Sequence, residues 1–256
     1  MLSATKISNN EKVYAWLINR EDKPFSCPEC GDEVILKKCI NKVDHFAHKP
    51  PTSCEFGQGE SEKHRACKLE IYERLLKEPS VTGCEIEKYF ESVRPDIFCY
   101  IRGIPVAIEV QISTLHIDQI IYRTIEYGRK GIYVLWLPLF SDKLLTTRYS
   151  PRLWEKWLHT TYFGRVYYWC KGLLLAPVHY DKHFIHIEER SWFDSYGNEQ
   201  SGGGYDRLSI KYITPKHGEL INLVRDLKPL YRKPTLNPMY TVPESRLLID
   251  KQPKWW

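Results

Sequence analysis

The spacing of apolar residues divides the segment 60–137 into two helices and four strands. Apolar positions recur at helical spacing near Leu69 and again near Ile120, whereas alternating or continuous apolar runs between them are typical of strands. Arg102-Gly103 stands between two such runs and indicates a tight turn. The predicted elements are a helix at 60–77, strands at 81–90, 97–101 and 104–108, a helix at 115–127 and a strand at 132–137. This order predicts an α/β core.

The flanking regions have weaker patterns. Before the core we predict an opening strand at 13–18. After it we predict a short helix near 153–157, a hairpin of 165–170 with 173–179, short strands at 184–187 and 208–213 separated by a Gly-rich loop at 201–204, and a helix at 220–231. The resulting division is 1–57 for a strand and a Cys-rich module, 58–140 for the α/β core, 141–233 for a basic aromatic α+β domain and 234–256 for an extended, proline-rich tail.

Polar side chains at the ends of two predicted strands form the first candidate site. Asp96 follows Pro95 and precedes one strand, while Glu109 and Gln111 end the next apolar run. Because side chains alternate along a strand, Glu109 and Gln111 point to the same face, and the hairpin register can bring Asp96 onto it. Two carboxylates with further oxygen ligands make a Mg²⁺-type site with positions left for water. Such a site is typical of metal-dependent phosphodiesterases.

Cysteines and histidines upstream of the core form the second candidate site. Cys27-x2-Cys30 can bind one Zn²⁺ from a tight turn, and tetrahedral zinc needs two more nitrogen or sulfur ligands. His48 and Cys54 are the preferred pair, with His45 as the alternative, because the two histidines have opposite parity in an extended segment. So many soft ligands indicate a structural zinc site rather than a chance motif with solvated histidines.

Glu60, His64 and Lys68 form a third pattern, in which successive members stand four positions apart. On a helix these side chains project in one row. An ordinary solvated helix face would look the same. The row becomes informative only beside the strands that carry Asp96 and Glu109.

Together these motifs resemble the competence protein CoiA-like family. The residues that carry the resemblance are Glu60-x3-His64-x3-Lys68, Arg94-Pro95-Asp96, Glu109-x-Gln111, Ser113, Arg123 and Tyr127, after Cys27-x2-Cys30 and His45-Phe46-Ala47-His48. That family is similar to the PD-(D/E)xK nuclease superfamily, with a zinc-ribbon-like segment before the nuclease core. The resemblance covers about residues 25 to 137 and leaves the C-terminal half without a family.

The resemblance implies a metal-dependent deoxyribonuclease. Asp96 and Glu109 would hold Mg²⁺ or Mn²⁺, with Glu60 as an outer or second-metal ligand, for in-line attack of water on a DNA phosphodiester. Gln111 would orient water or phosphate, and His64 would carry a proton or contact phosphate. The implied fold is a PD-(D/E)xK, restriction-endonuclease-like core between the zinc-binding module and a C-terminal α+β extension.

Gln111 departs from the superfamily pattern, which usually has a lysine at this position. A neutral amide cannot supply the missing positive charge. Either Lys68 replaces that charge from the helix, or the metal alone supplies it, or the site binds DNA without cutting. Arg123 is a candidate phosphate clamp, because a guanidinium binds phosphate through two donors, and a structural bond is the equal alternative.

Two functions from different classes therefore stand. One is a nuclease in DNA uptake, recombination, mobile-element or defence DNA processing. The other is a non-cleaving module that positions DNA, single-stranded or branched, for a partner helicase or recombinase.

The composition indicates how charge is distributed along the chain and in which compartment the protein is expected. Residues 1–140 carry 19 basic and 20 acidic side chains, and residues 141–256 carry 18 and 12, which suits a C-terminal half that faces nucleic acid. Aromatic residues alternate with basic ones there and can stack on bases, although core packing is the more common use. No secretory pattern opens the chain and no apolar stretch is long enough to span a bilayer, so we expect a cytoplasmic protein with reduced cysteines.

Overall fold

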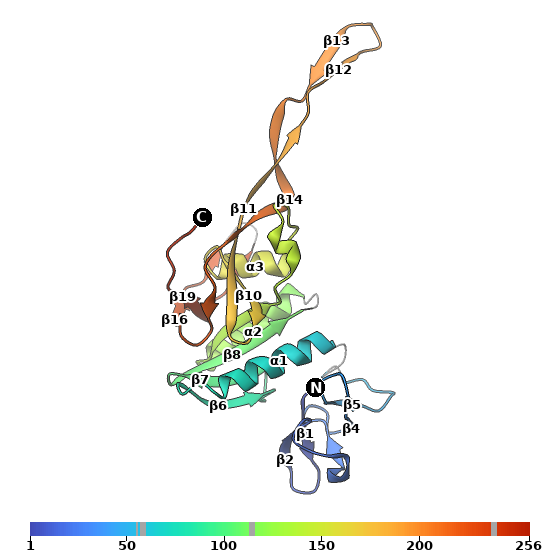
Figure 1. The fold of residues 1–256 in the computed structure, drawn as a ribbon, viewed down its shortest axis with the longest axis vertical. Helices are drawn as coiled ribbons and strands as arrows, with labels where there is room; N and C mark the ends of the chain where they lie inside the picture. Colours follow the sequence, from blue (N-terminus) through green and yellow to red (C-terminus); the bar gives the residue numbers. More distant parts are fainter. Residues whose placement is uncertain (55, 57–59, 113–115, 237–239) are drawn as a thin grey trace.

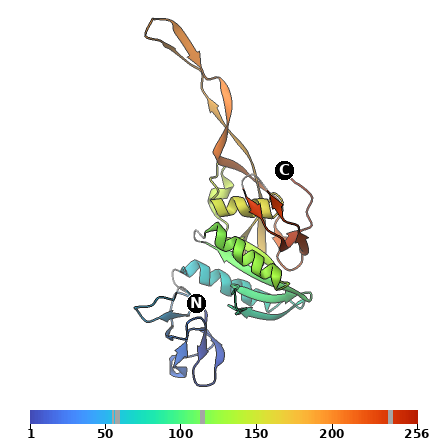
Figure 2. The same cartoon turned by 180° about the vertical axis from the view of Figure 1, so that it is seen from behind.

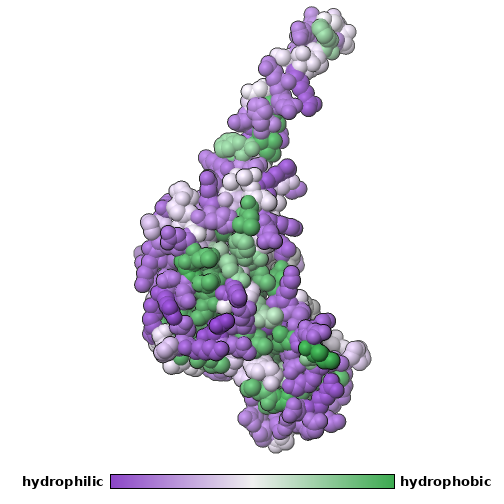
Figure 3. Space-filling view, viewed as in Figure 1, coloured by the Kyte–Doolittle hydropathy of each residue, from purple (hydrophilic) through white to green (hydrophobic). Residues whose placement is uncertain are grey.

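The computed structural model describes residues 1–54, 56, 60–112, 116–236 and 240–256. Three parts follow one another along its longest axis: an N-terminal module of short strands, a central body of sheets and helices, and a long two-stranded arm (Figure 1). In the space-filling view the N-terminal module stands apart at the lower right of the body, and the arm projects from the opposite end (Figure 3). The junction between the module and the body is where the candidate site lies.

The N-terminal module, residues 1–54, is a five-stranded antiparallel sheet with its own small core. Its strand order is β2-β1-β3-β4-β5. The elements are β1 (Ser3–Lys6), β2 (Glu11–Tyr14), the 3-10 helix η1 (Arg20–Asp22), β3 (Phe25–Ser26), β4 (Glu33–Lys37) and β5 (His45–His48). Phe25 and Phe46 pack edge to face in its core. The strand predicted at 13–18 is wrong in extent, because β2 ends at Tyr14 and pairs with β1.

A six-stranded sheet organises the central body. The observed elements from residue 60 are α1 (Glu62–Leu75), β6 (Val81–Ile86), β7 (Ile97–Ile101), β8 (Ile104–Gln111), α2 (Ile117–Arg129) and β9 (Tyr133–Pro138). Strands β6, β7 and β8 are antiparallel neighbours, and β9 is parallel to β8. The mixed α/β character expected from the sequence is therefore observed, in the order helix, three strands, helix, strand. Ser113 and Leu115, which the sequence analysis included in a motif and a helix, lie outside the described residues.

The two helices of this body cover opposite faces of the sheet. Helix α1 lies in front of the sheet in Figure 1, and α2 lies in front in the view from behind (Figure 2). The β7–β8 turn is as predicted: Arg102 and Gly103 both have positive φ, and Ile101 pairs directly with Ile104. A two-residue turn of this kind fixes the register of the hairpin, and hence where its side chains point.

The C-terminal half adds a second sheet and extends the first. Its elements are η2 (Asp142–Leu145), α3 (Leu153–Thr161), β10 (Val166–Lys171), β11 (Leu174–Ile187), β12 (Arg190–Phe193), β13 (Glu199–Gly202), β14 (Tyr205–His217), β15 (Ile221–Asn222), β16 (Leu227–Arg232), β17 (Thr235–Leu236), β18 (Thr241–Val242) and β19 (Ser245–Asp250). Strands β10, β11 and β14 form the second sheet together with the short β15, which pairs with β11, and the distal parts of β11 and β14 form the arm with β12 and β13 (Figure 1).

Three predictions for this half differ from the structure, two of them in extent and one in the type of element. The short strands at 184–187 and 208–213 are parts of the long strands β11 and β14, and half of the supposed loop at 201–204 belongs to β13. The helix at 220–231 does not form. The Asn222 side chain accepts hydrogen bonds from the amides of Val224 and Arg225, a turn that competes with helix, and Pro229 would interrupt a helix. Strand β16 occupies the second half of that segment.

The segment after Pro234 is more than an extended tail. Strand β19 lies between β9 and β16, parallel to the first and antiparallel to the second, so it completes the six-stranded sheet. Leu247 and Leu248 are buried there. Prolines near 234–243 suggest a tail locally, whereas pairing with β9 joins residues more than one hundred positions apart and leaves no local signal.

Core packing, which the sequence analysis favoured, holds for only part of the C-terminal aromatic residues: of those that the structure describes, five are buried and seven are exposed. Trp154, Trp157 and Tyr162 are buried, whereas Trp192, near the tip of the arm, is 52% exposed. Hydrophobic surface is visible on the lower arm (Figure 3). Among the described residues, no helix is long and apolar enough to cross a membrane.

Candidate metal-binding sites and the cavity between them

The four preferred zinc ligands converge at the edge of the N-terminal module. One ligand atom each from Cys27, Cys30, His48 and Cys54 lies within 4.8 Å of the others. The Cys30 Sγ and His48 Nε2 atoms are 3.4 Å apart. Tetrahedral zinc with bonds of about 2.3 Å to sulfur holds its ligands about 3.8 Å apart, so the donor set and its spacing fit zinc. The described structure therefore contains a possible Cys₃His zinc site.

The local chain shape explains this convergence. The Glu29 amide donates to Cys27 Sγ over 3.3 Å, and Gly31, at a φ of 79°, donates its amide to the Cys27 carbonyl. This is a tight turn that points both thiols of a CxxC motif the same way, and the positive φ favours glycine at its end. His45, the alternative ligand, lies outside the group. Its Nδ1 donates to the Val43 carbonyl over 3.0 Å.

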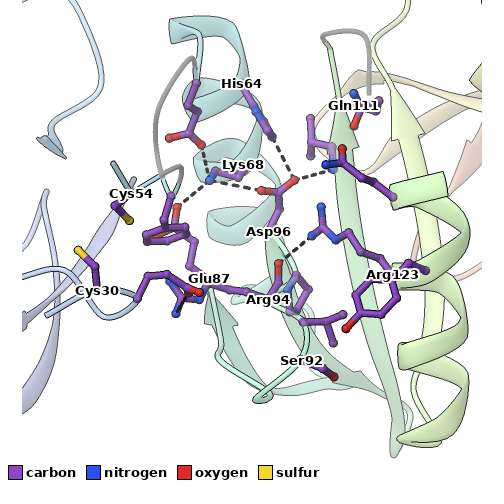
Figure 4. Close-up of a pocket in the computed structure, with 18 of the residues that line it drawn as sticks. Cys30, Cys54, His64, Lys68, Glu87, Ser92, Arg94, Asp96, Gln111 and Arg123 are labelled. Carbon is purple, nitrogen blue, oxygen red and sulfur yellow. Dashed lines mark hydrogen bonds and ion pairs between the residues drawn. The ribbon is translucent and has the colours of Figure 1, made fainter. Parts of the chain in front are cut away.

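A second group of ligand atoms lies where α1 begins. Glu60, His64 and Asp96 each offer one atom, and these atoms lie within 4.8 Å of one another. Ser61 caps the helix by accepting the His64 amide, which places Glu60 just before the helix and His64 in its first turn. Asp96 immediately precedes β7 and meets them from the sheet (Figure 4).

Asp96 is the centre of this group. Its Oδ2 accepts from His64 Nε2 at 3.0 Å and from the Val110 amide at 2.8 Å. Burial by itself raises the pKa of the Asp96 carboxyl, but His64 and Lys68 outweigh it and hold the pKa well below its usual range. Burial conversely disfavours the charged His64 ring, and Asp96 outweighs that effect and raises the pKa of His64. Each member of the pair therefore favours the charged form of the other.

Lys68 brings the positive charge that Gln111 lacks to this group. Its ammonium contacts carboxylate oxygens of Glu60, Glu87 at 2.7 Å and Asp96 at 3.4 Å, and its side chain is 3% exposed. Burial alone would lower the pKa of Lys68, but the three carboxylates raise it above its usual range. The ammonium is thus a fixed cation between two of the candidate metal ligands.

Glu109 is not brought into the same group. Its side chain is 1% exposed and bonds to the Tyr127 hydroxyl and to the Arg123 guanidinium, at 2.5 Å, on α2. Burial raises the pKa of Glu109 to about 7, although Arg123 opposes the rise. Strand β8 pairs Glu109 with Trp136, whose indole donates to Thr124 of α2, so this face of the sheet is the α2 face.

The remaining predicted residues line a shared cavity. Gln111 and Arg123 line it, and Arg123 also donates to the Arg94 carbonyl at 2.8 Å. Arg123 therefore has the structural bonds that the sequence analysis weighed against a phosphate clamp, and its side chain is 28% exposed.

That cavity joins the two candidate metal sites. It measures about 770 Å³ and is lined by the zinc-type residues Cys30 and Cys54 on one wall and by Glu60, His64 and Asp96 on the other (Figure 4). Its volume lies in the range of small-molecule and cofactor sites. The zinc-type module is therefore a wall of the candidate active site.

Two residues of this region have no role in the sequence analysis. Glu87, just after β6, is 4% exposed and bonds to Lys68. Arg94 pairs with Glu29 at 2.8 Å and donates to the Pro28 carbonyl, which ties the CxxC turn to the body. Nothing in the local sequence marks Glu87, because it stands in a mixed polar and apolar stretch. Arg94 belongs to the Arg94-Pro95-Asp96 motif, and this motif is the sequence signal that could have identified it.

Comparison with known proteins agrees with this geometry. Residues 60–163 match the family described as competence protein CoiA, nuclease-like domain, so the body is a nuclease-like domain by class. Residues 8–57 match competence protein CoiA, N-terminal domain. Over 120 residues the chain is 32% identical to Competence protein CoiA of Bacillus subtilis (strain 168). The matched segment covers 46% of this chain and 32% of that protein. The chain belongs to the competence protein CoiA-like family, as its motifs predicted.

The match spans about a third of the length of the Bacillus relative. No solved structure matches the chain.

Proposed function

We propose that this protein is a metal-dependent DNA nuclease of the PD-(D/E)xK type, with Zn²⁺ in a structural Cys₃His site. The observation that carries the proposal is the convergence of Glu60, His64 and Asp96 beside the Lys68 ammonium, inside a cavity of a nuclease-like domain. The helix–strand–strand–strand–helix–strand order supports the same assignment. The match to competence protein CoiA supports a role in DNA uptake and recombination.

The donor set fits a divalent cation of the Mn²⁺ kind well. Two carboxylates and an imidazole suit Mn²⁺, whereas Mg²⁺ prefers oxygen ligands alone and would favour Glu60 and Asp96. When bound, such an ion would polarise the phosphate and lower the pKa of water. The protein's own contribution is geometric: Asp96 is held by two donors, and His64 has an imidazole nitrogen that can hold a proton at the site.

Lys68 takes the role that a lysine on the strand has in the superfamily. Its ammonium lies 3.4 Å from Asp96 and can offset negative charge that develops on a phosphate. Gln111, which lines the cavity, would orient phosphate or water, and the partly exposed Arg123 side chain would bind a DNA phosphate. Glu109 is paired with Arg123, so it could bind the metal only if that ion pair breaks.

A specific observation favours the second candidate, a DNA-binding module that does not cut. Glu109, the acidic residue of the Glu-x-Lys position, is buried against α2 and outside the ligand group. In this alternative the same cavity would hold DNA for a partner helicase or recombinase.

The two candidates separate in a cleavage assay with a matched variant. Full-length protein is incubated with single-stranded, branched and duplex DNA and either Mg²⁺ or Mn²⁺, beside Asp96→Ala and Asp118→Ala. Asp118 is exposed in the first turn of α2 and does not line the cavity. Loss of a ligand predicts a drop in cleavage of at least about a hundredfold for Asp96→Ala, with Asp118→Ala unchanged.

DNA binding is measured in parallel by gel shift. Cleavage that survives in Asp96→Ala overturns the nuclease proposal. Binding without cleavage by the unaltered protein, under every metal and DNA tested, selects the binding module.

A further inference from the structure

One carboxylate connects the N-terminal module to the candidate active site. Glu87 accepts the Leu2 amide at 3.0 Å, the Ser3 amide at 2.9 Å and the Ser3 hydroxyl at 2.8 Å, and it accepts from Lys68 Nζ at 2.7 Å. Its partners thus come from both parts of the molecule: Ser3 on β1 and the preceding Leu2 belong to the module, and Lys68 belongs to α1 of the body. All of these bonds are buried, where charge-assisted hydrogen bonds are strong.

The backbone conformation at Glu87 indicates that surrounding contacts hold this residue in place. Its φ is 53°, in the left-handed region where glycine or asparagine is favoured. Other residues there are strained and persist where surrounding structure holds them. The Glu87 backbone is a further link to the module, because its carbonyl accepts a hydrogen bond from the Lys12 ammonium at 3.1 Å.

Lys68 has no bonding capacity beyond the three carboxylates. An ammonium has three N–H donors, and Glu60, Glu87 and Asp96 supply one oxygen each. Two of the three belong to the candidate metal group, and the third, Glu87, is held by the module. The position of the ammonium is therefore set from both parts of the molecule.

We propose that Glu87 is a positioning residue, which makes docking of the N-terminal module a condition for placing the Lys68 ammonium beside Asp96. The link to cleavage rests on the nuclease function proposed above, whereas the link between module and Lys68 does not. In this view the module has two tasks: it forms a wall of the cavity, and through Leu2 and Ser3 it holds Glu87 against Lys68.

Other contacts keep the module docked when Glu87 is altered. The Val43 amide donates to Glu62 at 2.7 Å, Arg94 pairs with Glu29, and Trp16 packs edge to face on Tyr72. A Glu87 variant can therefore fold, and Glu62→Gln is a matched control. Glu62 also lies on α1 and also binds the module, but its carboxylate pairs with Arg65, at 3.0 Å, rather than with Lys68.

The test compares Glu87→Gln, Glu62→Gln and Ser3→Ala in the full chain, with zinc content confirmed equal. Glutamine keeps the shape of Glu87 but loses the charge and turns an NH₂ group toward the donors of Leu2 and Ser3. Lys68 acetylation by a small amine-reactive reagent, without Mg²⁺ or Mn²⁺, is measured by mass spectrometry. Loss of one charge-assisted bond predicts acetylation about tenfold faster in Glu87→Gln, a smaller rise in Ser3→Ala and no change in Glu62→Gln.

Cleavage kinetics supply the second measurement. Glu87→Gln should lower kcat and leave KM within about twofold, because it misplaces a charge used in the transition state rather than a substrate contact. Unchanged Lys68 acetylation in both Glu87→Gln and Ser3→Ala overturns the proposal. An equal rise in Glu62→Gln also overturns it, since any loosened docking would then suffice. If the unaltered protein cuts no DNA, the nuclease function fails, and acetylation alone still decides the role of Glu87.

Discussion

The two candidate metal sites differ in how far apart their ligands lie in the sequence. The Cys₃His group comes from 28 consecutive positions, and all four preferred ligands converge. The acidic group combines the start of α1 with a residue before β7, more than thirty positions away, and here one predicted ligand, Glu109, lies elsewhere. A tight turn fixes the first group by local geometry, whereas the second depends on how helices cover the sheet.

The difference teaches where strand parity stops being informative. Parity correctly places Glu109 and Gln111 on one face of β8. It does not say which helix covers that face, and α2 supplies Arg123 and Tyr127, which bind the Glu109 carboxylate. Strand parity does not determine the direction of the Asp96 side chain, because Asp96 precedes β7 and turns toward α1.

The largest effect is expected from removing a ligand of the local site. Cys27→Ser should release the zinc and unfold the N-terminal module, because metal binding and folding of small zinc modules are one event. Cys39→Ser is the matched control, since Cys39 lies in the same module outside the ligand group. Zinc is counted by elemental analysis and folding by limited proteolysis. Less than about half an equivalent of zinc in the unaltered protein would contradict the site itself.

The sequence predicts those parts of the molecule that local chemistry determines. The α1–β9 order, the Arg102-Gly103 turn and the Cys₃His ligands all follow from spacing within short segments. Strand β19 could not be predicted, because its partner β9 is remote and its pairing shows only in three dimensions. Glu87 could not be predicted either, since its partners Leu2 and Ser3 come from a separate module and Lys68 comes from α1.

Acid should weaken the non-local site through Glu87. Burial raises the pKa of this carboxyl, but Lys68 and its other partners outweigh burial and lower the pKa from 4.5 to about 2. Because the folded-state pKa is depressed, the contribution to stability is present above pH 4.5 and is lost as the pH falls toward 2. The difference in unfolding free energy between the unaltered protein and Glu87→Gln should therefore narrow over this range.

Urea unfolding at a series of pH values measures that difference. Protonation of the zinc ligands affects both proteins alike and cancels in the comparison. A difference that stays constant down to about pH 2 would show that Glu87 is not the charged partner of Lys68.

A smaller effect on cleavage is expected at Glu109. Glu109→Gln keeps an oxygen that accepts from Tyr127 and Arg123, so we expect cleavage within about tenfold of the unaltered protein and a stability loss of about 1–3 kcal/mol. Asp96→Ala, measured in the same assay, gives the effect of losing a ligand. Equal losses in the two variants would mean that Glu109 leaves its pair with Arg123 and binds metal, as the family resemblance implied.

The smallest effect is expected at His45, and it tests the local site most finely. His45 and His48 stand three positions apart on β5, but the His45 ring donates to the Val43 carbonyl, whereas His48 Nε2 lies 3.4 Å from Cys30 Sγ. His45→Ala should therefore keep a full equivalent of zinc and lose only one partly exposed hydrogen bond, about 0.5–1.5 kcal/mol. His48→Ala should lose most of its zinc in the same elemental analysis. The reverse result would exchange the two histidines as ligands, and it would mean that the parity of a short strand misleads even where the ligands are local.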